Sequence, residues 1–128
     1  KRTEAKFESF IRAQLRAASM RWGPIYRVLG KAKVARGFYH CAACNEDVPL
    51  TTRINGKRVK NVHVDHTNPI VDPAVGFVNW DTLIARMFVE EDELQVLCND
   101  CHTKKTNEEK ATAKARRAGY IEEEEDIA

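Results

Sequence analysis

The stretch Leu94-Gln95-Val96-Leu97-Cys98-Asn99-Asp100-Cys101-His102-Thr103-Lys104-Lys105-Thr106 joins a short apolar run to a Cys-x-x-Cys pair and a polar segment. The apolar run predicts a short strand. The polar segment from His102 predicts a long helix that ends near Gly119, a typical C-cap residue. Asp100 is a possible N-cap of that helix. This stretch therefore predicts a strand and a helix joined by half of a metal site.

The other half of such a site is a second pair with the same spacing, Cys41-x-x-Cys44. Two pairs supply the four thiolates of a tetrahedral structural zinc site. The alternative is two disulfide bonds in a secreted protein, which requires an oxidising compartment. Because the N-terminus shows no apolar leader, we favour zinc. The proposed ligands are Cys41, Cys44, Cys98 and Cys101.

Length and composition favour one globular domain, since the chain has 128 residues of which 43% are hydrophobic. No apolar run reaches the roughly 20 residues of a membrane span, so we expect a cytoplasmic protein with no membrane partner. The net charge of +2 conceals two basic blocks, one before Gly37 and one after His102. Such blocks are typical of a polyanion binder, although a solvated helix face has the same composition.

Periodicity and turn residues outline the rest of the chain. One helix is expected over about residues 3–22, and a second from Pro24 to about Ala35. Asn55-Gly56 predicts a hairpin between strands at 50–54 and 57–64. Asn79 predicts the start of a third helix with an apolar stripe. We divide the chain into a basic helical arm (1–36), a main domain (37–119) and a disordered acidic tail (120–128).

The second hairpin strand ends in Val62-His63-Val64-Asp65-His66. Alternation along a strand places His63 and Asp65 on one face and directs Asp65 and His66 to opposite faces. A histidine with a near-neutral pKa can take a proton from water, and a carboxylate with an imidazole can hold a divalent ion. His63 is either a helper near such a site or an ordinary strand residue.

Two segments, Val64-Asp65-His66-Thr67-Asn68-Pro69 and Leu94–Thr106, resemble the HNH (His-Asn-His) endonuclease family. The resemblance covers about residues 39–117 and is closest to small HNH proteins of bacteriophages, many of them homing endonucleases. It implies an α+β fold with a zinc-stapled ββα-metal core behind the N-terminal basic helices. It also implies a phage-encoded enzyme that hydrolyses DNA phosphodiester bonds with Mg²⁺ or Mn²⁺, by nicking or by double-strand cleavage.

The same resemblance assigns roles to single residues. His66 is the general base, and Asp65 and His102 hold the catalytic divalent ion, while the zinc is structural. For the oligomeric state we leave two alternatives open, a monomer and a homodimer. DNA is expected to contact basic residues of the arm and the last helix: Arg12, Arg16, Arg21, Lys31, Lys33 and Lys105.

The chain departs from the family at Glu93, which stands where the middle Asn precedes the second strand. An ionised carboxylate accepts hydrogen bonds but cannot donate one as Asn does. Asn79 is a candidate substitute, and Glu93 itself is a candidate to approach the metal. The alternative function is therefore a zinc-stabilised DNA-binding module that does not cut.

Overall fold

A computed structural model of the chain describes residues 2–119, so the predicted acidic tail at 120–128 lies outside the described residues. The α+β class is confirmed, because helices and small antiparallel sheets share the described range. The helices are α1 (Glu4–Ser19), α2 (Gly23–Ala32), α3 (Trp80–Met87) and α4 (Asn99–Arg117), with a 3-10 turn η1 (Glu91–Glu93). Three sheets are formed by β1 (Lys33–Ala35), β2 (Phe38–His40) and β3 (Asp47–Pro49), by β4 (Thr51–Ile54) and β5 (Lys57–Lys60), and by β6 (Val62–His66) and β7 (Leu94–Cys98).

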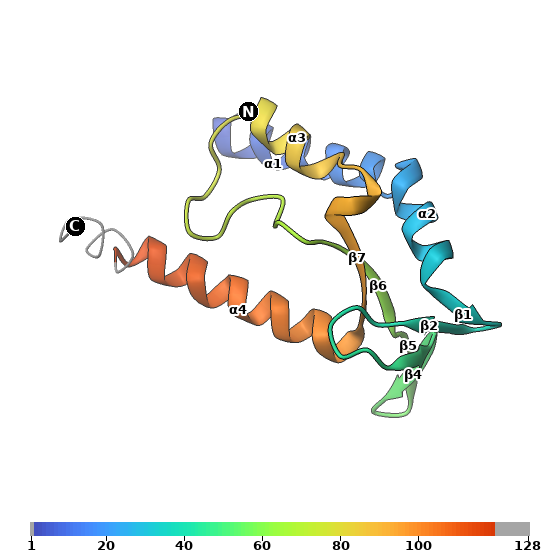
Figure 1. The fold of residues 1–128 in the computed structure, drawn as a ribbon. Coiled ribbons are helices and arrows are strands. Elements are labelled where there is room, and N and C mark those ends of the chain that lie inside the picture. The colour runs from blue at the N-terminus through green and yellow to red at the C-terminus, as the bar shows by residue number, and fades with distance from the viewer. Residues whose placement is uncertain (1, 120–128) are drawn as a thin grey trace.

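The centre of the molecule is the antiparallel pair β6 and β7, in which Val62 lies opposite Cys98 and His66 lies opposite Leu94. α4 follows β7 directly, and it contacts both strands (Figure 1). The buried apolar side chains of this region include Val62, Val96 and Leu97. The strand predicted at Leu94–Leu97 is therefore confirmed, and side chains from both of its faces are buried in the core.

The segment between β6 and β7 contains a loop, α3 and η1. α3 begins at the predicted N-cap, because the Asn79 side-chain oxygen accepts a hydrogen bond from the Thr82 amide at 2.7 Å. Leu83 and Met87 of the predicted apolar stripe are buried. In Figure 1 the loop lies between α3 and α4, while α1 runs beside α3.

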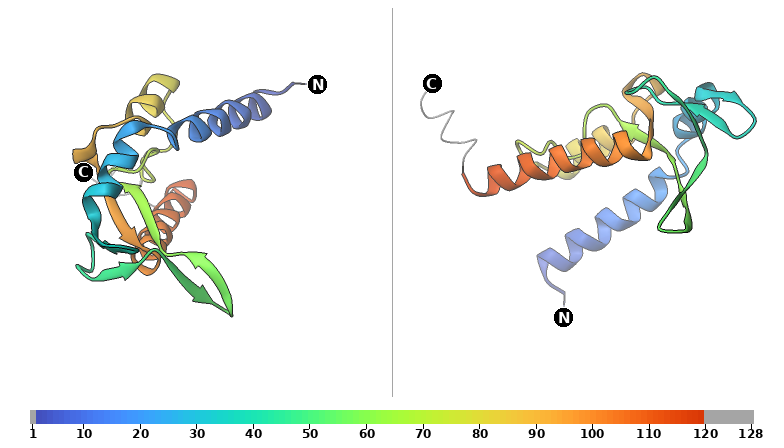
Figure 2. Two further views of the ribbon diagram at one scale, coloured as in Figure 1. Left: turned by 90° about the vertical axis from the view of Figure 1, so that its right-hand side faces the viewer. Right: turned by 90° about the horizontal axis from the view of Figure 1, so that it is seen from below.

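The N-terminal part begins with α1, whose N-terminal end projects away from the sheets (Figure 2). Its C-terminal end is tied to the body, since Trp22 Nε1 donates to the Val89 carbonyl at 2.7 Å. α2 starts at Gly23, one residue before the expected start at Pro24. It ends at Ala32, however, and the predicted extension to Ala35 is wrong. Residues 33–35 form β1, which pairs with β2 across the boundary that we drew at residue 36.

The hairpin of β4 and β5 turns at Asn55 and Gly56, both with positive φ, as predicted. Its second strand does not continue to Val64 as expected. Asn61 interrupts it, because its amide donates to the Leu50 carbonyl and its own carbonyl accepts from the Asn99 amide. The chain therefore changes partners here, from β4 to β7.

α4 begins at Asn99, three residues before the expected start. The predicted cap Asp100 lies inside its first turn, and the N-cap residue is Cys98, which makes no side-chain cap hydrogen bond. The helix ends before Gly119, whose φ of +87° confirms the predicted C-cap glycine. No helix in residues 2–119 combines the length and apolar character needed to cross a membrane.

Candidate functional site

The four cysteines converge on one point. Their sulfur atoms all lie within 4.8 Å of one another, and all four thiols are free. Zn–S bonds of about 2.3 Å place tetrahedral sulfurs about 3.8 Å apart, so the cluster is compatible with one ion. The predicted convergence of Cys41, Cys44, Cys98 and Cys101 is confirmed, and the cluster can hold a structural metal such as zinc.

The electrostatics of the cluster also favour a metal. Burial alone would raise the pKa of the Cys41 thiol, but backbone amides of Cys44, Cys98 and Ala43 donate to its sulfur and lower that pKa to about 6. The thiols compete for protons, and the hydrogen bond with Cys98, followed by burial, raises the pKa of Cys101 to about 12. A bound cation would relieve this competition by stabilising all the thiolates at once.

Local backbone structure prepares the first cysteine pair. After Cys44 the chain turns through Asn45, which has a φ of +61° that asparagine tolerates well. The Cys41 amide donates to the Glu46 carbonyl at 2.9 Å and closes the turn. His40 supports it from outside, with Nδ1 2.9 Å from an Asp47 carboxylate oxygen, a contact that raises the pKa of His40. His40 therefore stabilises the turn that follows the first cysteine pair.

A second group of polar side chains lies where β6 meets α4. The Asp65 carboxylate is 2.7 Å from the Lys105 ammonium and accepts a longer hydrogen bond from Gln95. Lys105 also contacts Glu109 at 2.8 Å and donates to the His66 carbonyl at 2.9 Å. Burial acts to lower the pKa of Lys105, but its hydrogen bonds to Asp65 and Glu109 produce a net rise. The ammonium expected to contact DNA is thus bound within the protein.

His66 points away from this group, as strand alternation predicts. Its Nε2 lies 2.8 Å from the Met87 carbonyl at the C-terminal end of α3. A carbonyl can only accept, so Nε2 carries the hydrogen and Nδ1 of the neutral ring keeps its lone pair. The ring is therefore held in a tautomer that can accept a proton at Nδ1.

His102 lies on the Asp65 side of β6, one turn of α4 before Lys105. Its ring stacks on that of His63, with centroids 4.5 Å apart and planes 19° apart. His63 Nε2 lies 3.2 Å from the Asn99 side-chain oxygen. Burial is the main cause of the lowered pKa of His63, and the neighbouring His102 adds to it. The His63 ring thus orients the His102 ring. Strand alternation alone does not predict this stacking of the two rings.

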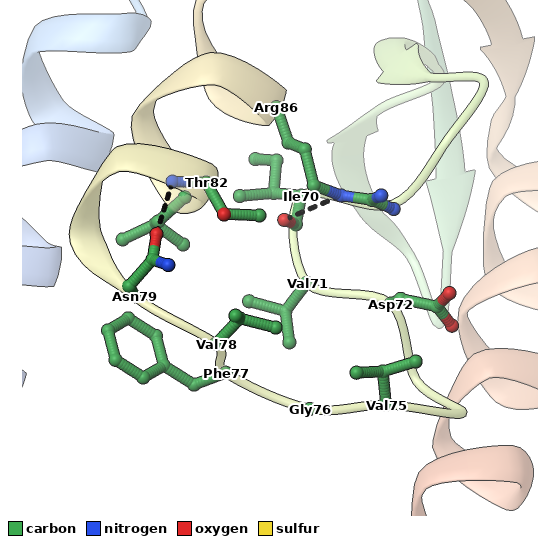
Figure 3. A pocket seen from close by; sticks show the side chains of 11 residues that line it. Ile70, Val71, Asp72, Val75, Gly76, Phe77, Val78, Asn79, Thr82 and Arg86 are labelled. Atoms are coloured by element: carbon green, nitrogen blue, oxygen red, sulfur yellow. Dashed lines mark hydrogen bonds between the residues drawn. The ribbon is translucent and has the colours of Figure 1, made fainter.

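Arg86 fixes the loop that follows His66. Its guanidinium group donates to the carbonyls of Pro69 and Ile70, with Nε 2.9 Å and 3.1 Å from the two oxygens. Figure 3 shows the Arg86–Ile70 contact at the edge of a cavity of about 100 Å³ between the loop and α3. Its walls are mainly aliphatic and include Val71 and Val78. Asp65, His66 and His102 do not line this cavity.

Glu93 acts through its backbone. Its carbonyl accepts hydrogen bonds from the amide of Thr67, at 3.0 Å, and from the Thr67 hydroxyl, at 3.2 Å. The Glu93 side chain is exposed. Asn79 lies at the start of α3, where its side-chain oxygen accepts from the Thr82 amide and caps the helix. The segment after His66 is held instead by Arg86 and by the Glu93 carbonyl.

The predicted DNA-contacting residues of the arm are distributed over α1, the turn after it, α2 and β1. Arg12 lies on α1 with its guanidinium carbon 5.3 Å from the Phe77 ring centroid, whereas Arg16 and Arg21 are exposed near the end of that helix. Lys31 forms an ion pair with Glu91 at 2.7 Å. Lys33 is exposed on β1, beyond α2.

Comparison with protein-family models, with curated proteins and with solved structures finds no match to this chain. A functional conclusion therefore rests on the residues and on the geometry described above.

Proposed function

We propose that this protein is a metal-dependent HNH endonuclease that hydrolyses phosphodiester bonds in DNA. The observation that carries the proposal is the hydrogen bond from His66 Nε2 to the Met87 carbonyl. It holds a histidine with a free Nδ1 directly beside Asp65, whose side chain faces the helix that carries His102. A base and a cation-binding carboxylate on opposite faces of one strand suit metal-assisted hydrolysis.

Each side chain has a defined task in this mechanism. Nδ1 of His66 accepts the proton of the attacking water, and the resulting positive ring is stabilised by the Met87 carbonyl. Asp65 and His102 would hold Mg²⁺ or Mn²⁺, and such an ion neutralises charge on the phosphate and the leaving oxygen. To bind the ion, Asp65 must give up or share its contact with the Lys105 ammonium, which lies 2.7 Å away. The products are a 5′-phosphate and a 3′-hydroxyl.

The four cysteines would bind zinc and have no part in the reaction. A site with four protein ligands is closed and offers no position to substrate. The zinc would join the segment Cys41–Cys44 after β2, here called the first knuckle, to the junction of β7 and α4. The helix that starts at this junction carries His102. DNA would be held by basic residues of α1 and α4 through its phosphates.

A second candidate function is a zinc-stabilised DNA-binding module without nuclease activity. The ion pair between Lys105 and Asp65 favours it, since an ammonium already neutralises the proposed metal ligand. The exposed carboxylate of Glu93, at the position of the family's Asn, favours it as well.

Plasmid cleavage in Mg²⁺ and in Mn²⁺, with a chelator control, separates the two functions. The nuclease proposal requires that the wild type nicks or linearises DNA and that His66→Ala does not. His40→Ala is the matched control, because the His40 ring contacts Asp47 and Asn45, and neither belongs to the proposed active site. If the wild type binds DNA and leaves it intact in both metals, the binding module is the better description. Glu93→Asn then tests whether the missing Asn is the reason.

A further inference from the structure

A second, larger cavity, which is widely open to solvent, lies along α4 from Thr106, one helical turn after His102. It has a volume of about 500 Å³ and is bounded by α4, the loop after β6 and the side chain of Arg12 from α1. Its walls combine cations with an aromatic ring and a hydroxyl, from Arg12, Phe77, Thr106, Lys110, Arg116 and Arg117. Cavities of roughly 300–1,000 Å³ are typical of small-ligand sites, and a DNA duplex is far too wide for one.

The charge of this cavity suits an anion. Four of its lining residues are cationic, and the one glutamate among them, Glu109, already forms an ion pair with Lys105 at 2.8 Å. The guanidinium of Arg12 lies near the Phe77 ring and 3.7 Å from Glu8, a long contact that leaves most of its donors free. Positive charge therefore gathers around an aromatic side chain.

Arg116 provides an independent sign of a missing acceptor. Its Nη1 donates to the Val75 carbonyl at 3.3 Å, but its Nε is buried and has no hydrogen-bond partner in the described part of the chain. Gly76 has a φ of +88°, a conformation that glycine adopts readily, and the Arg116 guanidinium packs closely against it. An unpaired buried donor is unfavourable, so an acceptor entering this wall is stabilised.

The cavity is also aligned with the proposed catalytic residues. His102, Thr106, Lys110 and Ala113 follow one another at helical spacing and share one face of α4. Lys110 lies eight residues after His102, which is about 12 Å along the helix at a rise of about 1.5 Å per residue. In a stacked strand that distance corresponds to about three to four nucleotides at about 3.4 Å each.

We propose that this cavity binds one unpaired nucleotide of the nucleic-acid substrate. Its base takes the place of the Arg12 guanidinium over the Phe77 ring, as bases stack on aromatic side chains in single-strand-binding proteins. Its phosphate contacts the displaced Arg12 together with Lys110 and Arg117. The nucleotide comes from a single strand or from a bulge in a duplex. Its place three to four nucleotides from the cut rests on the proposed nuclease function, whereas the binding itself does not.

Binding without cleavage tests the proposal. Fluorescence anisotropy, without added divalent metal, compares a labelled single-stranded deoxyoligonucleotide with the matching duplex and with that duplex carrying a one-nucleotide bulge. Phe77→Leu keeps apolar bulk but removes the stacking ring, and we expect it to weaken binding to an unpaired nucleotide by about five- to a hundredfold. Duplex binding should change less than twofold. Loss on the single strand alone indicates a strand end or flap, and loss on the bulge as well indicates an extruded base.

The matched control is Arg58→Gln, since Arg58 is exposed on β5 and does not line the cavity. Lys110→Gln should reduce binding of the unpaired nucleotide more than Arg58→Gln does. Thermal melting followed by circular dichroism verifies that Phe77→Leu stays folded, because Phe77 also packs on Trp80. Equal losses on duplex and single strand, or no loss on either in folded protein, would overturn the proposal. A protein that binds in this way but never cleaves would contradict the nuclease proposal alone.

Discussion

Lys105 decides whether Asp65 can accept a divalent ion. The Lys105 ammonium lies 2.7 Å from the Asp65 carboxylate, and the Lys105 side chain is partly buried. A divalent ion must therefore displace the ammonium or share the carboxylate with it. Like charges repel strongly in a partly buried site. We therefore expect Lys105→Met to strengthen Mn²⁺ binding by on the order of tenfold. Spin resonance of free Mn²⁺ measures this directly.

The control for that variant is Lys104→Met, because Lys104 is exposed beside Lys105. It removes the same charge without a contact to Asp65, and Mn²⁺ affinity should barely change. If both variants behave alike, the Asp65 carboxylate is not the place where the ion binds.

A second prediction at this scale concerns the cap of α3. The Asn79 side chain accepts from the Thr82 amide, and loss of such a cap costs about 1 kcal/mol. Asn79→Ala should lower the free energy of unfolding by that amount in urea titrations, whereas Asn79→Asp, which still caps, should be nearly neutral. A similar loss for Asp would show that the donor side of the amide matters more than the cap.

Among the elements, α3 is the one that positions the proposed base. Its last turn contacts both ends of the segment after β6, through the Met87 carbonyl at His66 and through Arg86 at Pro69 and Ile70. Lysine cannot reproduce the forked contact of arginine. Arg86→Lys should therefore reduce the cleavage rate about tenfold or more while DNA affinity stays within twofold.

The measurement for Arg86 is single-turnover cleavage at saturating protein, together with DNA affinity by anisotropy. Arg27→Lys is the control, since Arg27 pairs with Glu91 at the surface and not with the loop. An unchanged cleavage rate for Arg86→Lys would mean that the loop is held well enough by Glu93 and Met87 alone.

Elements whose limits are set by local signals could be predicted from the sequence. Asn55-Gly56, Asn79 and Gly119 each mark a turn or cap by its own conformational preference, and each was predicted correctly. The break at Asn61 was not, because it depends on contacts with Pro49 and Asn99, which are distant in the sequence.

The same distinction applies to the candidate site. Strand alternation alone predicts that the side chains of Asp65 and His66 diverge. The acceptor of His66 is a backbone carbonyl of Met87, and no sequence pattern marks such an atom. The spacing of Lys105 and Glu109, four residues apart on a helix, was the one available sign that Lys105 is bound within the protein.

At the scale of the whole molecule, the four-cysteine cluster forms part of the core. A buried cluster of Cys41, Leu97 and Cys98 packs with Val48 and Cys101, so the ligands themselves are a large share of it. Besides the cysteines, only Leu97 and Val48 of the described residues belong to this cluster, which joins the Cys41–Cys44 segment to the start of α4. A metal that links these segments should therefore contribute much of the stability of the fold.

Cys44→Ser tests that contribution, because Cys44 is exposed and its loss leaves no cavity. We expect this substitution to lower the free energy of unfolding by about 2–5 kcal/mol, since loss of a metal is among the most destabilising changes. Ala43→Ser adds a hydroxyl at the neighbouring exposed position and should be nearly neutral. Elemental analysis and thermal melting, with and without a strong chelator, supply the readouts. Wild-type protein that melts at the same temperature with and without zinc would show that the thiols stabilise the fold without a metal.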